Sequence, residues 1–189
     1  MAKRFETIDE SRREFIRRQR MFFAASAAEG SRINISPRST EHFHVLSDRS
    51  VAYLDLTGSG SETSAHLKAD GRLTIMFCAF EGAPLILRLY GRGRSAFHGS
   101  EAFEAFLAEH YDGKAPVGAR QIVLLDVELV LTSCGFGVPL FDYVGERPTL
   151  TRWAEKKGEE GLVEYRREKN SVSLDGLPTG MPEAADLFT

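Results

Sequence analysis

A polar bend at residues 57–63 holds the side chains best suited to binding chemistry in this sequence. The segment Thr57-Gly58-Ser59-Gly60-Ser61-Glu62-Thr63 follows an apolar, strand-like run and leads into a helix that we expect to begin near Ser59 or Ser61. Glycine lets the backbone turn sharply, and a helix start presents unpaired N–H groups and the positive end of the helix dipole. This combination suits an anionic ligand such as a phosphate group.

The same bend has an explanation that needs no ligand. Ser59 and Glu62 fit a capping box, in which the serine caps the helix and the glutamate reaches back to the backbone. The two readings are compatible, because a helix start binds phosphate through the same donors. Arg32 and Arg38, from an earlier strand, could add charge-assisted hydrogen bonds. Glu62 would repel a phosphate unless its side chain turned back onto the backbone.

Other kinds of site have less support. His42 and His44 alternate along an expected strand and could touch a metal, but no third ligand is in reach, so we expect no metal site. The sequence has no G-x-S-x-G motif, no Walker-type phosphate loop and no C-x-x-C pair. We therefore assign no catalytic residue.

Composition narrows the class of protein. The chain has 189 residues, is 42% hydrophobic and 27% charged, and carries a formal net charge of −3, which argues against nucleic acid as a partner. No apolar run approaches the ~20 residues that cross a bilayer, and the charged N-terminus lacks the apolar core of a signal peptide. Two cysteines are too few for a disulfide framework, so a cytoplasmic protein with no membrane contact is expected.

The elements that must position the bend are mostly strands. We expect helices at residues 9–19 and 100–111, the second capped by Ser100, and strands at 20–27, 32–36, 42–46, 50–56, 73–80, 85–97 and 121–132. Short turns between them favour antiparallel pairing in a barrel or sandwich. Gly91 and Gly93 suggest a bulge or a close approach in the long strand.

The character of the chain changes after residue 132. An irregular, aromatic stretch leads into what resembles two short charged helices, with too few apolar residues to fold alone. We therefore expect a barrel domain at residues 1–132 and a C-terminal extension at residues 133–189 that packs on the barrel or on a second subunit.

The order of these pieces resembles a known family. A helix, then FFAASAAEGSRINISPRS, VAYLDLTGSGSETSAHLKADGRLTIMF and LILRLYGRGR, is similar over residues 5–131 to the FMN-binding split β-barrel of the pyridoxamine 5′-phosphate oxidase family. The tail CGFGVPLFDYVGERPTLTRWAEKKG resembles that of an uncharacterised branch of it. The resemblance implies a mainly β (α+β) fold: a split antiparallel β-barrel with flanking short helices and a helical or irregular C-terminal extension. It also implies a homodimer with FMN in clefts between the subunits.

Carried over by position, the resemblance implies a cofactor site on one strand and on the bend. The members on the strand are Arg32, Ser36 and Arg38, and those on the bend are Leu56, Thr57, Gly58, Ser61, Glu62 and Thr63. The oxidase has an Arg-Lys pair where Glu62-Thr63 stand, so the phosphate grip here would rest on hydroxyls, backbone amides and the more distant arginines.

The implied function is that of an FMN-dependent oxidoreductase of unknown small-molecule substrate, with a nicotinamide cofactor or that substrate as electron donor. The alternative is a non-catalytic split-barrel protein that binds flavin, heme or deazaflavin, and His42 and His44 keep the heme version open. A third reading is an interaction barrel with an empty cleft.

Overall fold

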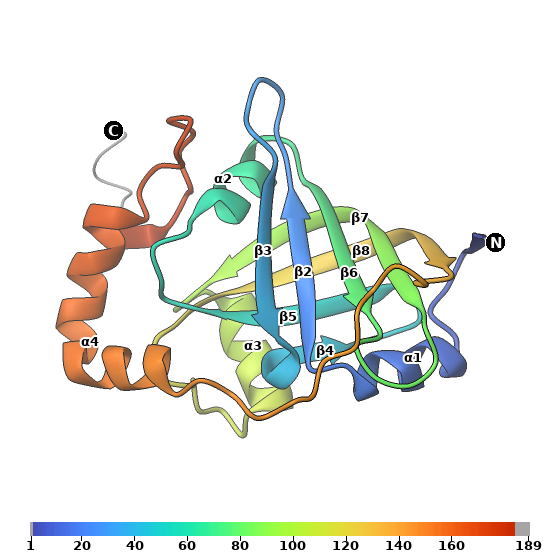
Figure 1. Ribbon diagram of the computed structural model, residues 1–189. Helices are drawn as coiled ribbons and strands as arrows, with labels where there is room; N and C mark the ends of the chain where they lie inside the picture. Colours follow the sequence, from blue (N-terminus) through green and yellow to red (C-terminus); the bar gives the residue numbers. More distant parts are fainter. Residues whose placement is uncertain (1, 184–189) are drawn as a thin grey trace.

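A single curled antiparallel sheet forms the body of the computed structural model, which describes residues 2–183 (Figure 1). The strands are β1 (Lys3–Phe5), β2 (Met21–Ser26), β3 (Asn34–Ser39), β4 (Phe43–Val45), β5 (Ser50–Leu56), β6 (Arg72–Cys78), β7 (Ile86–Phe97) and β8 (Ala119–Ser133). The helices are α1 (Glu10–Arg18), the 3₁₀ turn η1 (Thr40–His42), α2 (Glu62–Ala69), α3 (Glu101–His110) and α4 (Thr149–Lys169).

The sheet curls into a split barrel whose opening lies beside the predicted cofactor site. Its strand order is β3-β2-β6-β7-β8-β5-β4, with β1 added along β8, and every pair is antiparallel. The path ends at β3 on one side and at β4 on the other. In the part of the chain that the structure describes, β3 does not pair with β4 or β5, and at this opening side chains join the two sides, as in the ion pair of Arg38 with Asp55. The expected split antiparallel barrel is confirmed.

Two apolar clusters fill the barrel. The larger one lies between the two walls of the curled sheet around Phe22, Phe77 and Leu89, all at most 1% exposed. The smaller one joins α3 to β5 and β8 through Phe103 and Ile122, both 0% exposed. Side chains of this size each contribute about 1.5–3 kcal/mol when fully buried, so the barrel is a rigid support for the site.

The bulge expected at Gly91 is present. The pairing of β7 with β8 shifts register between Tyr90 and Gly91. A Cβ at Gly91 would lie 1.9 Å from the backbone oxygen of Asp126, so only glycine lets the two strands approach this closely. A Cβ at Gly93 would likewise crowd the side chains of Leu67 and Leu73.

Most element boundaries follow local chemistry. Ser100 caps α3 as expected, with its hydroxyl accepting from the Phe103 N–H at 3.3 Å. The strand expected at residues 32–36 instead runs from Asn34 to Ser39 and includes Pro37. Proline is tolerated there because β3 is an edge strand, where a missing N–H costs no ladder bond. β1 was not predicted from the sequence.

The C-terminal part covers two sides of the barrel. Residues 134–148, the strap, run past the ends of β6, β2 and β3, and the N–H of Phe141 donates to the Phe80 oxygen at 3.0 Å (Figure 1). α4 then rises along one side of the barrel, kinked at Gly158, whose φ is 67°, and its last turns contact the bend that precedes α2. Residues 170–181, the C-terminal turn, end next to the predicted bend. Residues 184–189 of the expected extension lie outside the described residues.

Candidate functional site

β3 turns a polar face toward the opening of the barrel and an apolar face outward. Asn34, Ser36 and Arg38 are half-buried, whereas Ile33 and Ile35 are 73% and 63% exposed. Alternate residues of a strand point to opposite faces. The sequence alternation therefore places the polar set, not the isoleucines, against the site.

A buried carboxylate, Asp55, spans the gap between β3 and β5. It is 1% exposed and accepts hydrogen bonds from Arg38, from Arg120 Nε at 2.9 Å and from Gln121 Nε2 at 2.7 Å. Burial raises the pKa of Asp55, but the charges of Arg120 and Arg38 outweigh it and hold this pKa below its ordinary value. The trio of Arg38, Asp55 and Arg120 thus carries a net charge of +1.

Some buried polar atoms near the opening are hydrogen-bonded and others have no partner. Among the bonded ones, Asn34 Nδ2 donates to Thr63 Oγ1 at 3.1 Å, and Ser26 Oγ lies 3.0 Å from His66 Nδ1. In contrast, the Tyr53 hydroxyl, His66 Nε2 and Arg38 Nε are buried without a hydrogen-bond partner among the described residues. Burial raises the pKa of Tyr53 to about 12, so its hydroxyl stays protonated. Orphaned polar groups of this kind point to a ligand or ordered water.

The bend at residues 57–61 turns its carbonyl groups inward. Arg120 donates to the oxygens of Gly58 at 3.1 Å and Gly60 at 2.5 Å, and Asn170 Nδ2 donates to Gly58 at 2.9 Å. In a trans peptide the N–H points opposite to the C=O. The N–H groups of Ser59 and Ser61 therefore point away from Arg120, to the outer side of the bend.

One of these outward N–H groups is already bound to an anion. The Ser61 N–H donates to the Glu62 carboxylate at 3.0 Å, so Glu62 does fold back onto the backbone. The expected capping box is nevertheless wrong in naming Ser59 as the residue that caps the helix. The N-cap is Ser61, and its side chain makes no cap bond, because its hydroxyl donates to the Val172 oxygen at 3.2 Å.

The C-terminal turn and the end of α4 lie against this bend. Arg166 Nη1 donates to the Thr57 hydroxyl at 3.2 Å, and that hydroxyl donates to the Gly118 oxygen at 2.8 Å. Asp175 pairs with Arg32 across to the start of β3. The tail therefore contacts the predicted site at two places, the bend and the start of β3.

The structure brings the nine predicted residues into one region but gives them different surroundings. Thr57, Ser61 and Thr63 are buried and hydrogen-bonded within the chain, whereas Arg32 is 73% exposed. Leu56 ends β5 opposite Ala119. Sequence reasoning missed Asp55, Arg120, Gln121, Asn34 and Asn170, which organise the site. A charged residue inside the apolar run SVAYLDL was the available signal for Asp55.

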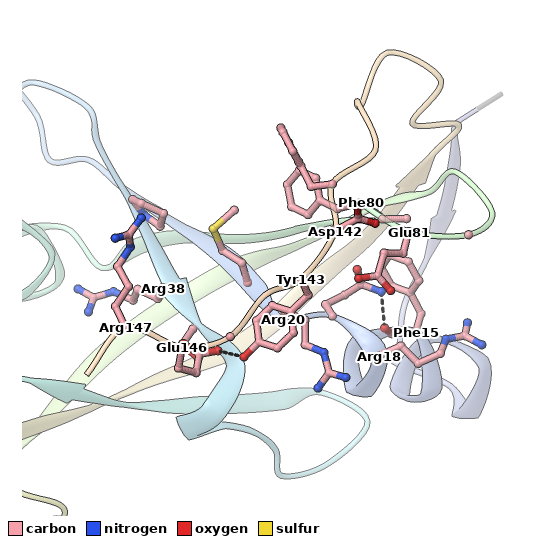
Figure 2. A pocket seen from close by; sticks show the side chains of 18 of the residues that line it. Phe15, Arg18, Arg20, Arg38, Phe80, Glu81, Asp142, Tyr143, Glu146 and Arg147 are labelled. Atoms are coloured by element: carbon pink, nitrogen blue, oxygen red, sulfur yellow. Dashed lines mark hydrogen bonds between the residues drawn. The ribbon is translucent and has the colours of Figure 1, made fainter. Parts of the chain in front are cut away.

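A cleft of about 860 Å³ opens at the other end of β3, between the barrel and the strap (Figure 2). Arg38 is the one predicted residue that lines it. The cleft is within the size range of small-molecule sites, roughly 300–1,000 Å³.

The histidines considered for a metal or heme are engaged elsewhere. His44 Nε2 lies 2.9 Å and His42 Nδ1 3.2 Å from the Tyr111 hydroxyl. Burial, with the nearby His110 and His42, lowers the pKa of His44 to about 4. Among residues 2–183 no group of three or more metal-ligating side chains is assembled.

Comparison with protein-family models identifies the family of this barrel. A family model described as pyridoxamine 5′-phosphate oxidase matches residues 8–134, which is more than half of the chain. The chain belongs to the pyridoxamine 5′-phosphate oxidase family. The expected family is thereby confirmed.

A family relative from Aspergillus flavus, the pyridoxamine 5′-phosphate oxidase family protein ustO, is 40% identical over 190 residues, covering 92% of this chain and 76% of the relative. Coverage this high extends the similarity past residue 134 into the tail.

Solved structures support the family fold. A single-residue variant of HupZ from Group A Streptococcus has a TM-score of 0.52 at 18% identity, over 67% of this chain and 99% of that one. A Lactobacillus delbrueckii protein has a TM-score of 0.51 at 14% identity, over 67% and 94% of the two chains. In the described residues, no helix combines the length and the apolar character that crossing a membrane requires.

Proposed function

We propose that this pyridoxamine 5′-phosphate oxidase family member is a cytoplasmic, homodimeric FMN-binding oxidoreductase that acts on a small molecule. FMN would be held along the polar face of β3 by Arg32, Ser36 and Arg38, with its phosphate at the bend formed by residues 56–63. The flavin supplies the redox chemistry when bound, and the protein supplies position and electrostatics.

The single observation that carries this proposal is the orphaned polar lining of the barrel opening. Tyr53, His66 and Arg38, the last on the polar face of β3 itself, each bury a polar atom with no partner among the described residues. A buried polar group without a partner costs about 1–3 kcal/mol, and a polar ligand in the opening would recover part of that cost.

The bend also fits a phosphate. One of its outward N–H groups, that of Ser61, already donates to an anion, the Glu62 carboxylate. Arg32 is exposed and free to turn from Asp175 toward a phosphate. A phosphate is the stronger acceptor and carries more charge than a carboxylate, so it can displace Glu62 from the Ser61 N–H.

A homodimer is supported by apolar surface on the outer side of the same strand. Ile33 and Ile35 are exposed beside each other at a sheet edge that has no partner strand among residues 2–183. An exposed sheet edge of this kind can pair with a strand of another chain or be covered by another chain. A second subunit covering β3 would also wall the proposed FMN site.

The optical spectrum of the purified protein tests the function. A flavin spectrum that bleaches anaerobically on addition of reduced nicotinamide supports the oxidoreductase. A flavin spectrum that does not bleach supports the non-catalytic alternative, and a Soret band supports a heme protein, in which His42 or His44 would have to leave Tyr111. A colourless protein that does not take up added FMN contradicts the proposal.

Replacing Arg32 by alanine tests the site. Hydrogen bonds to charged groups contribute about 1.5–3 kcal/mol, so Arg32→Ala should weaken FMN binding by roughly 10-fold or more, measured by quenching of flavin fluorescence. Stability should hardly change, because Arg32 is 73% exposed. The matched control is Arg49→Ala, which removes an exposed ion pair with Glu6. Equal FMN affinity in both variants would remove Arg32 from the site.

A further inference from the structure

The cleft between the barrel and the strap shares Arg38 with the proposed FMN site, and its other lining residues lie outside that site. One wall comes from α1, β2 and β3, and the other comes from strap residues 141–147. The strap lies outside residues 8–134, which the family model matches.

One end of the cleft carries a net positive charge. Arg147 has no ion pair with a carboxylate among the described residues, and it lies with Arg38 at the same end of the cleft (Figure 2). Arg38 belongs to the trio with Asp55 and Arg120 that keeps a net charge of +1. Two guanidinium groups at one end of a cleft form a typical site for a carboxylate or phosphate.

The acidic residues of the cleft offset that charge only in part, because Glu146, next to Arg147 in the chain, is, among the described residues, the one carboxylate of the lining near that end. Glu146 accepts the Tyr143 hydroxyl at 2.8 Å. Glu81 and Asp142 lie at the opposite end from Arg38 and Arg147 (Figure 2). The remaining cations, Arg18 and Arg20, add to the positive balance, and the Arg20 guanidinium sits 5.1 Å from the centre of the Tyr143 ring.

The space between the two ends is lined by flat and apolar side chains. Phe80 and Phe141 pack with ring centres 5.4 Å apart and join the barrel to the strap. Met21 of β2 and Pro37 of β3 also line the cleft. Walls of this kind favour a ring over an extended polar molecule, because aromatic groups bury apolar area with little loss of conformational freedom.

We propose that this cleft binds a small aromatic carboxylate, with its carboxylate on Arg38 and Arg147 and its ring between the strap and β2–β3. The anion is placed by the two guanidinium groups, and the ring is selected by the apolar walls. This binding does not require FMN, because Arg147 and the strap take no part in the proposed flavin site; only Arg38 belongs to both.

Benzoate is the probe, with benzyl alcohol and benzylamine as neutral and cationic controls of the same shape. Binding to the full-length protein is followed by calorimetry and by the ¹³C-methyl NMR signal of Met21, which lines the cleft and is assigned with Met21→Leu. We expect saturable benzoate binding that shifts the Met21 signal, with affinity at least 10-fold above that of either control. Equal binding of benzylamine and benzoate, or no binding of benzoate, overturns the proposal.

The variant Arg147→Gln locates the carboxylate. Arg147 is exposed on the strap, so its replacement leaves the barrel core intact. We expect at least a 10-fold loss of benzoate affinity, with FMN affinity unchanged, whereas Arg152→Gln on the exposed face of α4 changes neither. Unchanged benzoate binding in Arg147→Gln refutes the assignment.

Discussion

Removing the charge of Asp55 is the sharpest test of how the barrel opening is held. In Asp55→Asn the shape is kept, but Arg38 and Arg120 face each other without the carboxylate that joins them. Breaking a buried ion pair from one side costs about 3–5 kcal/mol. Arg38 is 22% exposed and can turn toward water, and Arg120 keeps its carbonyl acceptors, so the lower end of that range, about 3 kcal/mol, is expected.

Urea unfolding at pH 7 measures this loss, which corresponds to a fall in Tm of roughly 6–12 °C for a protein of this size. The matched control is Asp126→Asn, whose exposed pair with Arg94 should contribute at most about 1 kcal/mol. Because the folded-state pKa of Asp55 is lowered, its contribution is present above pH ~4 and is lost as the pH falls through the folded pKa. The wild-type and Asp55→Asn stabilities should therefore converge in acid. A loss below about 1 kcal/mol at pH 7, or one equal to that of the control, would refute the bridging role of Asp55.

Two further substitutions test the close packing at Gly91 and the protonation of His44. Gly91→Ala should destabilise the protein by at least about 2 kcal/mol in urea unfolding, because its Cβ would lie 1.9 Å from a backbone oxygen; Gly137→Ala, with open space around it, is the control, and similar losses in both would contradict the close packing at the bulge. The pKa of His44 is lowered to about 4 from an ordinary 6.5, so wild-type stability should decline as the pH falls from 6.5 to 4. In His44→Gln this decline should be smaller in thermal melts over that range, and an identical pH profile would show that His44 is not kept neutral by the fold.

Local patterns were sufficient to predict most of the barrel. Alternating or wholly apolar runs marked the strands, and Ser100 marked the start of α3, because both signals depend on residues that are close in sequence. Gly91 predicted the bulge for the same reason, since only a missing side chain permits that approach. The fold-back of Glu62 was one of two stated options, and its partner, the Ser61 N–H, is adjacent in the chain.

The contacts that organise the site were not predictable in this way. Asp55 meets Arg120 and Arg38 across the opening, and Asn170 reaches Gly58 from the tail. These pairs are far apart in sequence, and no periodicity links their members. The edge position of β3, which allows Pro37 inside a strand, also became clear only from the strand order.

The position of the tail over the bend sets an order of events during synthesis. Asn170 follows Gly58 by 112 positions, and chains grow at about 5–20 residues per second, so the bend waits roughly 6–22 s for the side chain that covers it. The carbonyl side of the bend is therefore completed late, after the barrel strands up to β8 and the whole of α4 have been made.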